Sequence, residues 1–158
     1  MVEWVGYSAS RVAQRRFLFP TFYDNRWTFD VGRYPYHGGE KVAVSFSKGG
    51  RHAEQPEGWT FLVDLSRRYL EPRLRDELLA RVHRGETVTV GGSVEMNRDG
   101  ISCVKPRFSL PWNAVSPPTL QNGLIVIARR GVAAPLVTVP LGHPNAVLIP
   151  DLYAALAR

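Results

Sequence analysis

The fold prediction depends on residues 59–82, which have the sequence WTFLVDLSRRYLEPRLRDELLARV. Within this segment a run typical of a strand is followed by an apolar repeat typical of a helix. The first seven residues, 59–65, are rich in aromatic and β-branched side chains and predict a strand. After Pro72, which suits the first turn of a helix, three apolar side chains recur every four residues: Leu74, Leu78 and Val82. We therefore expect a strand at 59–65 and then an amphipathic helix at 72–84.

The end of the chain has the same order of elements. Residues 134–139, APLVTV, predict a strand, and a turn containing Pro and Gly separates them from a short helix at 151–158. Asp151 is expected to cap this helix. The similarity of the two segments predicts two related strand-rich units, residues 1–85 and residues 86–158, each closed by one C-terminal helix.

The remaining apolar segments predict antiparallel strands. Alternating or β-rich sequences occupy seven further segments: 15–19, 26–31, 40–46, 86–96, 97–104, 107–112 and 116–128. Asp99-Gly100 and Asn122-Gly123 lie between apolar runs and are typical of tight hairpin turns. The sequence therefore predicts an α+β fold that is mostly antiparallel β.

Composition limits the size and the location of the protein. The chain has 158 residues, of which 44% are hydrophobic, so it can form one domain or two small ones. Cys103 is the single cysteine, which fits a reducing compartment. The first 20 residues lack the apolar stretch of a secretory signal, and no apolar run approaches the roughly 20 residues of a spanning helix. We therefore expect a cytoplasmic protein.

The formal charge of +6 raises the question of an anionic partner. Among the 20 basic residues, 17 are arginines, and the net charge divides into +4 for residues 1–85 and +2 for residues 86–158. No basic stripe stands out along the chain. This distribution favours a solvated charged surface over an anionic partner.

The second half of the chain resembles a known family in its structural punctuation. The matching features are a Pro-Trp pair that ends a strand, a Gly hairpin turn and an apolar turn before the last helix: Pro111-Trp112, Asn122-Gly123 and Pro144-Asn145. Residues 72–158 thus resemble the bacterial pleckstrin-homology-like domains of uncharacterised actinobacterial proteins, whereas residues 1–71 resemble them weakly. The resemblance implies a strongly bent sandwich or barrel with one open end closed by a helix. It also implies a binding or scaffold role.

Motifs of catalysis are missing from the sequence. Residues 47–52, SKGGRH, lack the spacing of a phosphate-binding loop, and residues 6–10, GYSAS, lack the second Gly of a nucleophile elbow. The four histidines are far apart, and none of them pairs at helical spacing. We therefore predict no enzyme activity, no cofactor and no metal site.

A basic and aromatic N-terminal half supplies the candidate binding residues. They are Arg15, Arg16, Arg26, Arg33, Tyr34, Lys48 and Arg51. Arginine beside aromatic rings can stack on bases and neutralise phosphates, or meet anionic lipid headgroups. The simpler interpretation, which we favour, places the aromatic rings in the core and the arginines around its rim.

These observations predict a non-catalytic cytoplasmic binding or scaffold module. Its expected partner is another protein or an anionic membrane surface. The alternative is a nucleic-acid-binding protein that uses the basic aromatic N-terminal half.

Overall fold

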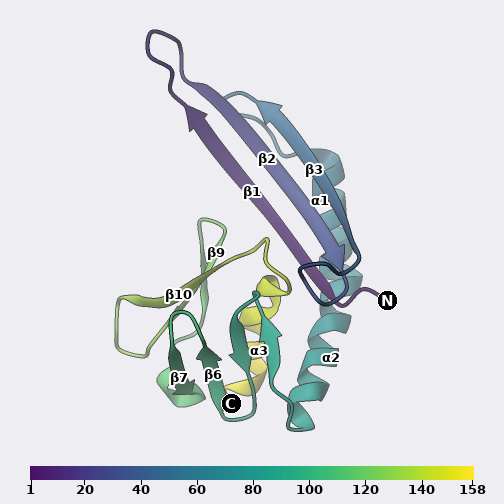
Figure 1. The fold of residues 1–158 in the computed structure, drawn as a ribbon, viewed down its shortest axis with the longest axis vertical. Coiled ribbons are helices and arrows are strands. Elements are labelled where there is room, and N and C mark those ends of the chain that lie inside the picture. The colour runs from purple at the N-terminus through teal and green to yellow at the C-terminus, as the bar shows by residue number, and fades with distance from the viewer.

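The computed structural model describes residues 1–158 and begins with a long antiparallel sheet. Its strands are β1 (Trp4–Gln14), β2 (Phe22–Gly32) and β3 (Lys41–Gly49), in the order β1-β2-β3. The β1–β2 ladder is unbroken from the pair Trp4–Gly32 to the pair Gln14–Phe22. This hairpin is the longest feature of the molecule and runs along its long axis (Figure 1).

A single long helical segment follows this sheet. It consists of α1 (Glu57–Leu65), the π-helical turn η1 (Ser66–Leu70) and α2 (Glu71–His83). The prediction of a strand at 59–65 was therefore wrong, and the predicted helix begins earlier than residue 72. Trp59 and Val63 are one turn apart and both are buried, so this apolar run packs one helical face on the sheet.

Pro72 explains the wide turn in the middle of the helix. Proline has no N–H to donate to the carbonyl one turn earlier, so an unbroken α-helical ladder cannot continue through it. The π-helical turn Ser66–Leu70 directly precedes this position, and the amide of Glu71 donates to the carbonyl oxygen of Ser66. Pro72 thus stands in the first turn of α2, as expected, but in a helix that is already under way.

The second half of the chain forms two smaller antiparallel sheets. The first is a four-stranded meander of β4 (Val88–Val90), β5 (Val94–Met96), β6 (Gly100–Cys103) and β7 (Phe108–Pro111). The 3-10 turn η2 (Trp112–Ala114) leads out of it. These strands confirm the expected hairpin between β5 and β6.

The last sheet and helix complete the fold. The strands β8 (Thr119–Gln121), β9 (Leu124–Ala128) and β10 (Pro135–Pro140) are ordered β10-β9-β8. The 3-10 turn η3 (Ala146–Leu148) and the helix α3 (Ile149–Leu156) follow. The fold is thus α+β and mostly antiparallel β, as predicted.

Three details of the predicted elements are corrected. Residues 15–19 form the loop of the β1–β2 hairpin instead of a strand. The last helix begins at Ile149, two residues early, and its N-cap is Leu148 with no capping side-chain hydrogen bond, so Asp151 is not the cap. The repeat hypothesis loses its first strand, because 59–65 is helical.

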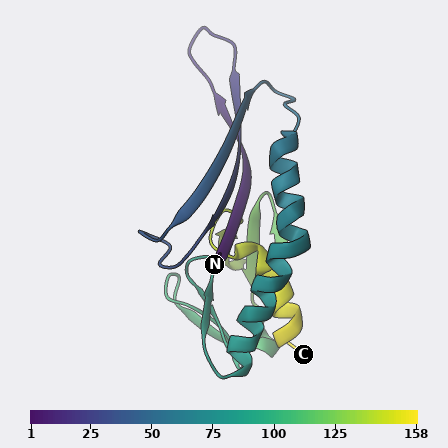
Figure 2. The ribbon, with the colours of Figure 1, turned by 90° about the vertical axis from the view of Figure 1, so that its right-hand side faces the viewer.

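The core of the molecule is one continuous cluster of buried side chains. It contains Val5, Tyr7 and Phe29 from the first sheet together with residues of the helix, the two smaller sheets and α3. Figure 2 shows why: α1 lies beside the long sheet, and α2 continues along the second half, where it packs beside α3. The boundary at residues 85 and 86 falls in the turn after α2 and stays a prediction. No helix is both long and apolar enough to cross a membrane.

Asn145 ties the end of the chain to β1. It is fully buried, its Oδ1 accepts the N–H of Val5 at 3.0 Å, and its Nδ2 donates to the carbonyl oxygen of Glu3 at 3.0 Å. Its own amide donates to the carbonyl oxygen of Val5 at 2.8 Å. Gly6 permits this approach, because a side chain there would collide with the carbonyl oxygen of Gly142.

Replacing Asn145 tests whether these bonds hold the two halves together. Both Asn145 (φ 58°) and Asn122 (φ 50°) have left-handed backbones, but Asn122 lies in the exposed hairpin turn between β8 and β9. Asn145→Ala leaves the buried Val5 amide without its side-chain acceptor, so we expect a loss of about 2–4 kcal/mol in urea unfolding. Asn122→Ala should lower the free energy of unfolding by about 1 kcal/mol, because this position has the left-handed backbone in common with Asn145 but not its buried hydrogen bonds. Equal losses in the two variants would contradict the assignment.

Candidate functional site

The outer part of the β1–β2 hairpin projects beyond the helix, and the end of β3 pairs with its base. In both views it extends past the first turn of α1, so no helix covers it (Figures 1 and 2). Residues 9–20 are all exposed. We call residues 9–26 the finger.

The end of the finger is apolar. Five large side chains there are more than half exposed: Val12, Phe17, Leu18, Phe19 and Phe22. Phe17 and Leu18 are 92% and 89% exposed, which is extreme for apolar residues inside a folded chain. The amide of Phe19 donates to the carbonyl oxygen of Arg16 at 3.1 Å and closes the turn. We call these five residues the tip.

Basic side chains flank the tip and lie directly behind it. They are Arg11, Arg15, Arg16, Arg26, Lys48 and Arg51, which we call the collar. Strand register places Lys48 beside Asn25 and Arg26 on β2, so the end of β3 and the loop that follows it lie against the finger. Five of the seven predicted binding residues therefore gather in one region.

The other two predicted residues lie at the opposite end of the sheet. Arg33 and Tyr34 follow β2, where the chain turns toward β3, and Arg33 pairs with Glu40 at 3.8 Å. They are not part of the finger. The structure thus divides the predicted set into a gathered group of five and a separate pair.

The collar corrects the prediction of an evenly distributed charge. Segments 11–26 and 47–52 contain six basic residues and one acidic residue, Asp24, which give a net charge of +5. The whole chain carries +6. The positive charge is divided between two segments in the sequence, and antiparallel pairing brings them together.

The favoured interpretation of the aromatic residues was only half right. Trp4, Tyr7, Trp27 and Phe29 are core residues, as it required. Phe17, Phe19 and Phe22 belong to the tip and contribute nothing to the core. The one sequence feature that distinguishes them is the Phe-Leu-Phe run between two arginines and Pro20, which has no alternation to bury one side of a strand.

Asn25 fixes the geometry of the finger at the collar. Its side chain is buried, and its Nδ2 donates to the carbonyl oxygens of Lys48 at 3.0 Å and Gly50 at 2.7 Å. Its Oδ1 accepts the Nε–H of Arg11 at 2.9 Å. One side chain thus joins β1, β2 and the loop after β3, and it holds the collar in place. Nothing in the sequence around Asn25 indicated this role.

A buried polar cluster lies where the π-helical turn meets the sheet. The hydroxyl groups of Ser66 and Tyr7 donate to Oε1 of Glu71 at 3.0 and 3.2 Å, and the guanidinium of Arg67 lies 6.0 Å from the centroid of the Tyr7 ring. Burial raises the pKa of Tyr7 to about 12. Burial also raises the pKa of Glu71, against the effect of the two hydroxyl donors. Sequence reasoning missed this cluster because Tyr7 is 64 residues away from Glu71 in the chain.

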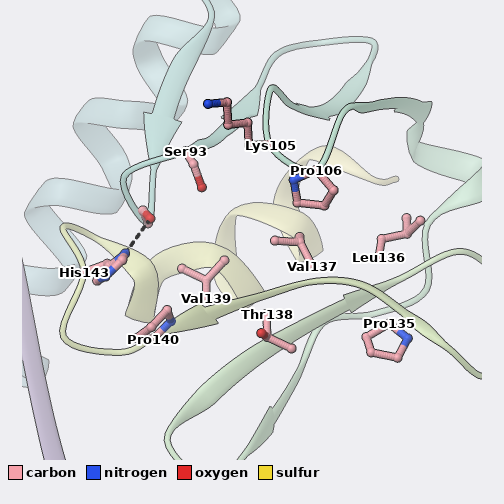
Figure 3. Close-up of a pocket in the computed structure, with 11 residues that line it drawn as sticks. Ser93, Lys105, Pro106, Pro135, Leu136, Val137, Thr138, Val139, Pro140 and His143 are labelled. Atoms are coloured by element: carbon pink, nitrogen blue, oxygen red, sulfur yellow. Dashed lines mark hydrogen bonds between the residues drawn. The ribbon is translucent and has the colours of Figure 1, made fainter.

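Two clefts lie elsewhere on the molecule. The first, about 430 Å³, lies between the β4–β5 turn, the β6–β7 turn and β10 (Figure 3). Ser93 and Lys105 lie across it from Val137 and Val139, and His143 Nδ1 is 3.1 Å from the carbonyl oxygen of Gly91. Prolines at both ends of β10 remove donors from this edge strand.

The second cleft, about 500 Å³, is bordered by Tyr34 and by the side of α2 that carries Leu74, Glu77, Leu78 and Arg81. Burial raises the pKa of Tyr34. The charged groups of this cleft already have partners, since Glu77 pairs with Arg73, and Arg81 pairs with Glu86 at 2.8 Å. No buried side-chain polar atom in the chain lacks a hydrogen-bond partner. Neither cleft therefore contains a buried side-chain polar atom without a partner.

Comparisons with the models of known protein families, with curated proteins and with solved structures find no match for this chain. The finger, with its apolar tip and basic collar, is thus the candidate site on the evidence of its own exposure and charge.

The pKa of Glu71 leads to a test of the buried cluster. Because the folded-state pKa is raised above the ordinary value of 4.5, the folded protein favours the neutral carboxyl. The stability that this contributes is present below pH 4.5 and is lost as the pH rises through the folded-state pKa. Glu71→Gln is neutral at every pH, so the stability of this variant relative to the parent should increase between about pH 4 and pH 7 in urea unfolding.

Ser66→Ala provides the matched control with the opposite sign. Its hydroxyl group lowers the pKa of Glu71 by donating to the carboxylate, so removing it raises that pKa further. Ser66→Ala should therefore lose more stability relative to the parent at pH 7 than at pH 4. Parallel pH profiles for the two variants would show that Glu71 does not titrate within this cluster.

Proposed function

We propose that the protein is a non-catalytic cytoplasmic binding or scaffold module and that the finger is its contact surface. The observation that supports this proposal is the exposure of the tip, where five large apolar side chains of the hairpin are in contact with solvent and do not enter the core. Contiguous exposed apolar groups rimmed by polar residues mark interaction sites in soluble proteins.

The architecture of the hairpin also supports a contact role. The core residues of β1 and β2 lie in the inner half of the hairpin, where α1 covers the sheet. The ladder nevertheless continues to the pair Gln14–Phe22, beyond the last core residues. Those outer pairs add no buried apolar contact to the core. They extend the hairpin, so that the tip and the collar lie away from the body of the molecule.

The chain offers a natural control for the finger. The turn between β9 and β10 has the sequence ARRGVA at residues 128–133, with two exposed arginines and a half-exposed Val132. It thus resembles the finger in charge and exposure but lacks the aromatic residues. Arg129→Gln/Arg130→Gln is the counterpart of Arg15→Gln/Arg16→Gln.

Removing the tip should abolish binding and leave the fold intact. We expect Phe17→Ser/Leu18→Ser/Phe19→Ser to unfold in urea within about 0.5 kcal/mol of the parent, because exposed positions contribute little stability. The same variant should lose at least about tenfold in affinity for the class of macromolecule that the parent binds, among lipid vesicles, single-stranded nucleic acid and photo-crosslinked proteins. Arg129→Gln/Arg130→Gln should bind like the parent.

Two results would contradict the proposal. One is a tip variant that binds all three classes of macromolecule as well as the parent does. The other is an equal loss of affinity in the finger variants and in Arg129→Gln/Arg130→Gln. That result would mean that the contact lies elsewhere or that binding depends only on the net charge of the protein.

A further inference from the structure

We infer that the partner of the finger is an anionic lipid bilayer, with the tip inserted among the acyl chains and the collar at the level of the phosphates. This inference rests on the proposed function, since it names the occupant of the same contact surface. It is argued from three features: the chemistry of the tip, the position of the collar and the convex shape of the finger.

The tip combines aromatic and aliphatic side chains in a way that suits an apolar liquid. Three of its five members are phenylalanines, but Leu18 and Val12 have no ring to stack on a base. Leu18 lies at the centre of the turn and is 89% exposed. A side chain in this position gains nothing from a nucleic-acid groove, whereas the acyl region of a bilayer removes it from water.

Two collar residues behind the turn, Arg11 and Lys48, lie at the depth that the phosphate layer requires, whereas Arg15 and Arg16 lie in the turn beside Phe17, from where their long side chains can reach back to the phosphates. Strand register places Arg11, Asn25 and Lys48 in one row across the three strands, and this row is three residues behind the last pair, Gln14–Phe22. At about 3.4 Å per residue, the row stands roughly 10 Å behind the last ladder pair. Apolar groups at a membrane interface lie about 5–10 Å below the headgroup boundary. The turn can therefore lie among the acyl chains while the row of Arg11, Asn25 and Lys48 lies at the level of the phosphates.

The collar surrounds the finger on both faces of the sheet. Arg11 and Lys48 share the face on which α1 packs farther down, because their row includes the inward-facing Asn25. Arg26 is the next residue along β2 and therefore lies on the opposite face, where it pairs with Asp24 at 3.8 Å. Cations on both faces suit a plane of phosphates that the finger penetrates, whereas a protein groove would contact one face.

The convex shape of the finger favours a deformable partner. The tip residues line neither of the two clefts described above, and the loop projects into solvent (Figure 1). Asn25 and its three hydrogen bonds brace the base of the finger. A braced convex finger inserts into a fluid layer without needing a complementary cavity on the partner.

Flotation with vesicles tests the inference directly. The probes are vesicles of phosphatidylcholine alone and vesicles containing about 30% phosphatidylglycerol, at low and at high salt. The parent should float with the anionic vesicles and remain behind with the neutral ones, and its binding should weaken as salt rises. Each basic side chain near the surface contributes about fivefold in partitioning, so Arg15→Gln/Arg16→Gln should lose about 25-fold. Arg129→Gln/Arg130→Gln should match the parent.

A tryptophan reporter measures insertion itself. All four native tryptophans are buried, so a new one at the tip adds an exposed signal. The emission of Phe17→Trp should shift to the blue with anionic vesicles and should be quenched by lipids brominated along the acyl chain. Val132→Trp, in the control hairpin, should show neither effect. Inorganic phosphate alone should leave the emission of Phe17→Trp unchanged, which separates the bilayer from its headgroup chemistry.

The outcomes separate this inference from the proposed function. Absence of vesicle binding, or vesicle binding without quenching of Phe17→Trp, overturns the bilayer as partner. If substitution of the tip then abolishes binding to single-stranded nucleic acid or to a protein, the finger remains the contact surface with a different partner. If tip substitutions affect none of the three classes, both the inference and the proposed function fail.

Discussion

The helical segment at residues 57–83 packs against both the first sheet and the second half of the chain, and this packing holds the two together. Trp59 and Val63 in α1 cover the long sheet, and Leu74, Leu78 and Val82 in α2 enter the same core farther along. Each fully buried side chain of this kind stabilises the fold by about 1.5–3 kcal/mol. Where α1 begins, this cover ends, and the hairpin continues without a partner as the finger.

The position of the helix thus divides the hairpin into two parts with different roles. The inner part contributes Val5, Tyr7 and Phe29 to the core and is tied to the end of the chain by Asn145. The outer part carries the tip and the collar and is braced by Asn25. Substitutions in the tip can therefore change what the protein binds at little cost in stability, because the core lies elsewhere.

The sequence predicted the strand-rich class and two of the hairpins, β5–β6 and β8–β9, because alternation and Asn-Gly or Asp-Gly turns are local properties. It failed at 59–65, where a nearly continuous apolar run fits a strand or a helix, and only packing of Trp59 and Val63 on the sheet decides between them. It predicted five collar residues individually. Their gathering depends on strand register, and the exposure of the Phe-Leu-Phe run depends on where α1 begins, so neither follows from the sequence alone.

Hydrogen exchange with and without anionic vesicles can locate the contact surface, because it reports on every part of the chain in one measurement. Insertion of the finger should add protection in the finger and in the adjoining loop after β3. Exchange in the helix at 57–83 and in the strands from β4 to β10 should be unchanged. Protection that appears instead along β10 or beside Tyr34 and α2, with none in the finger, would show that the finger is not the contact surface.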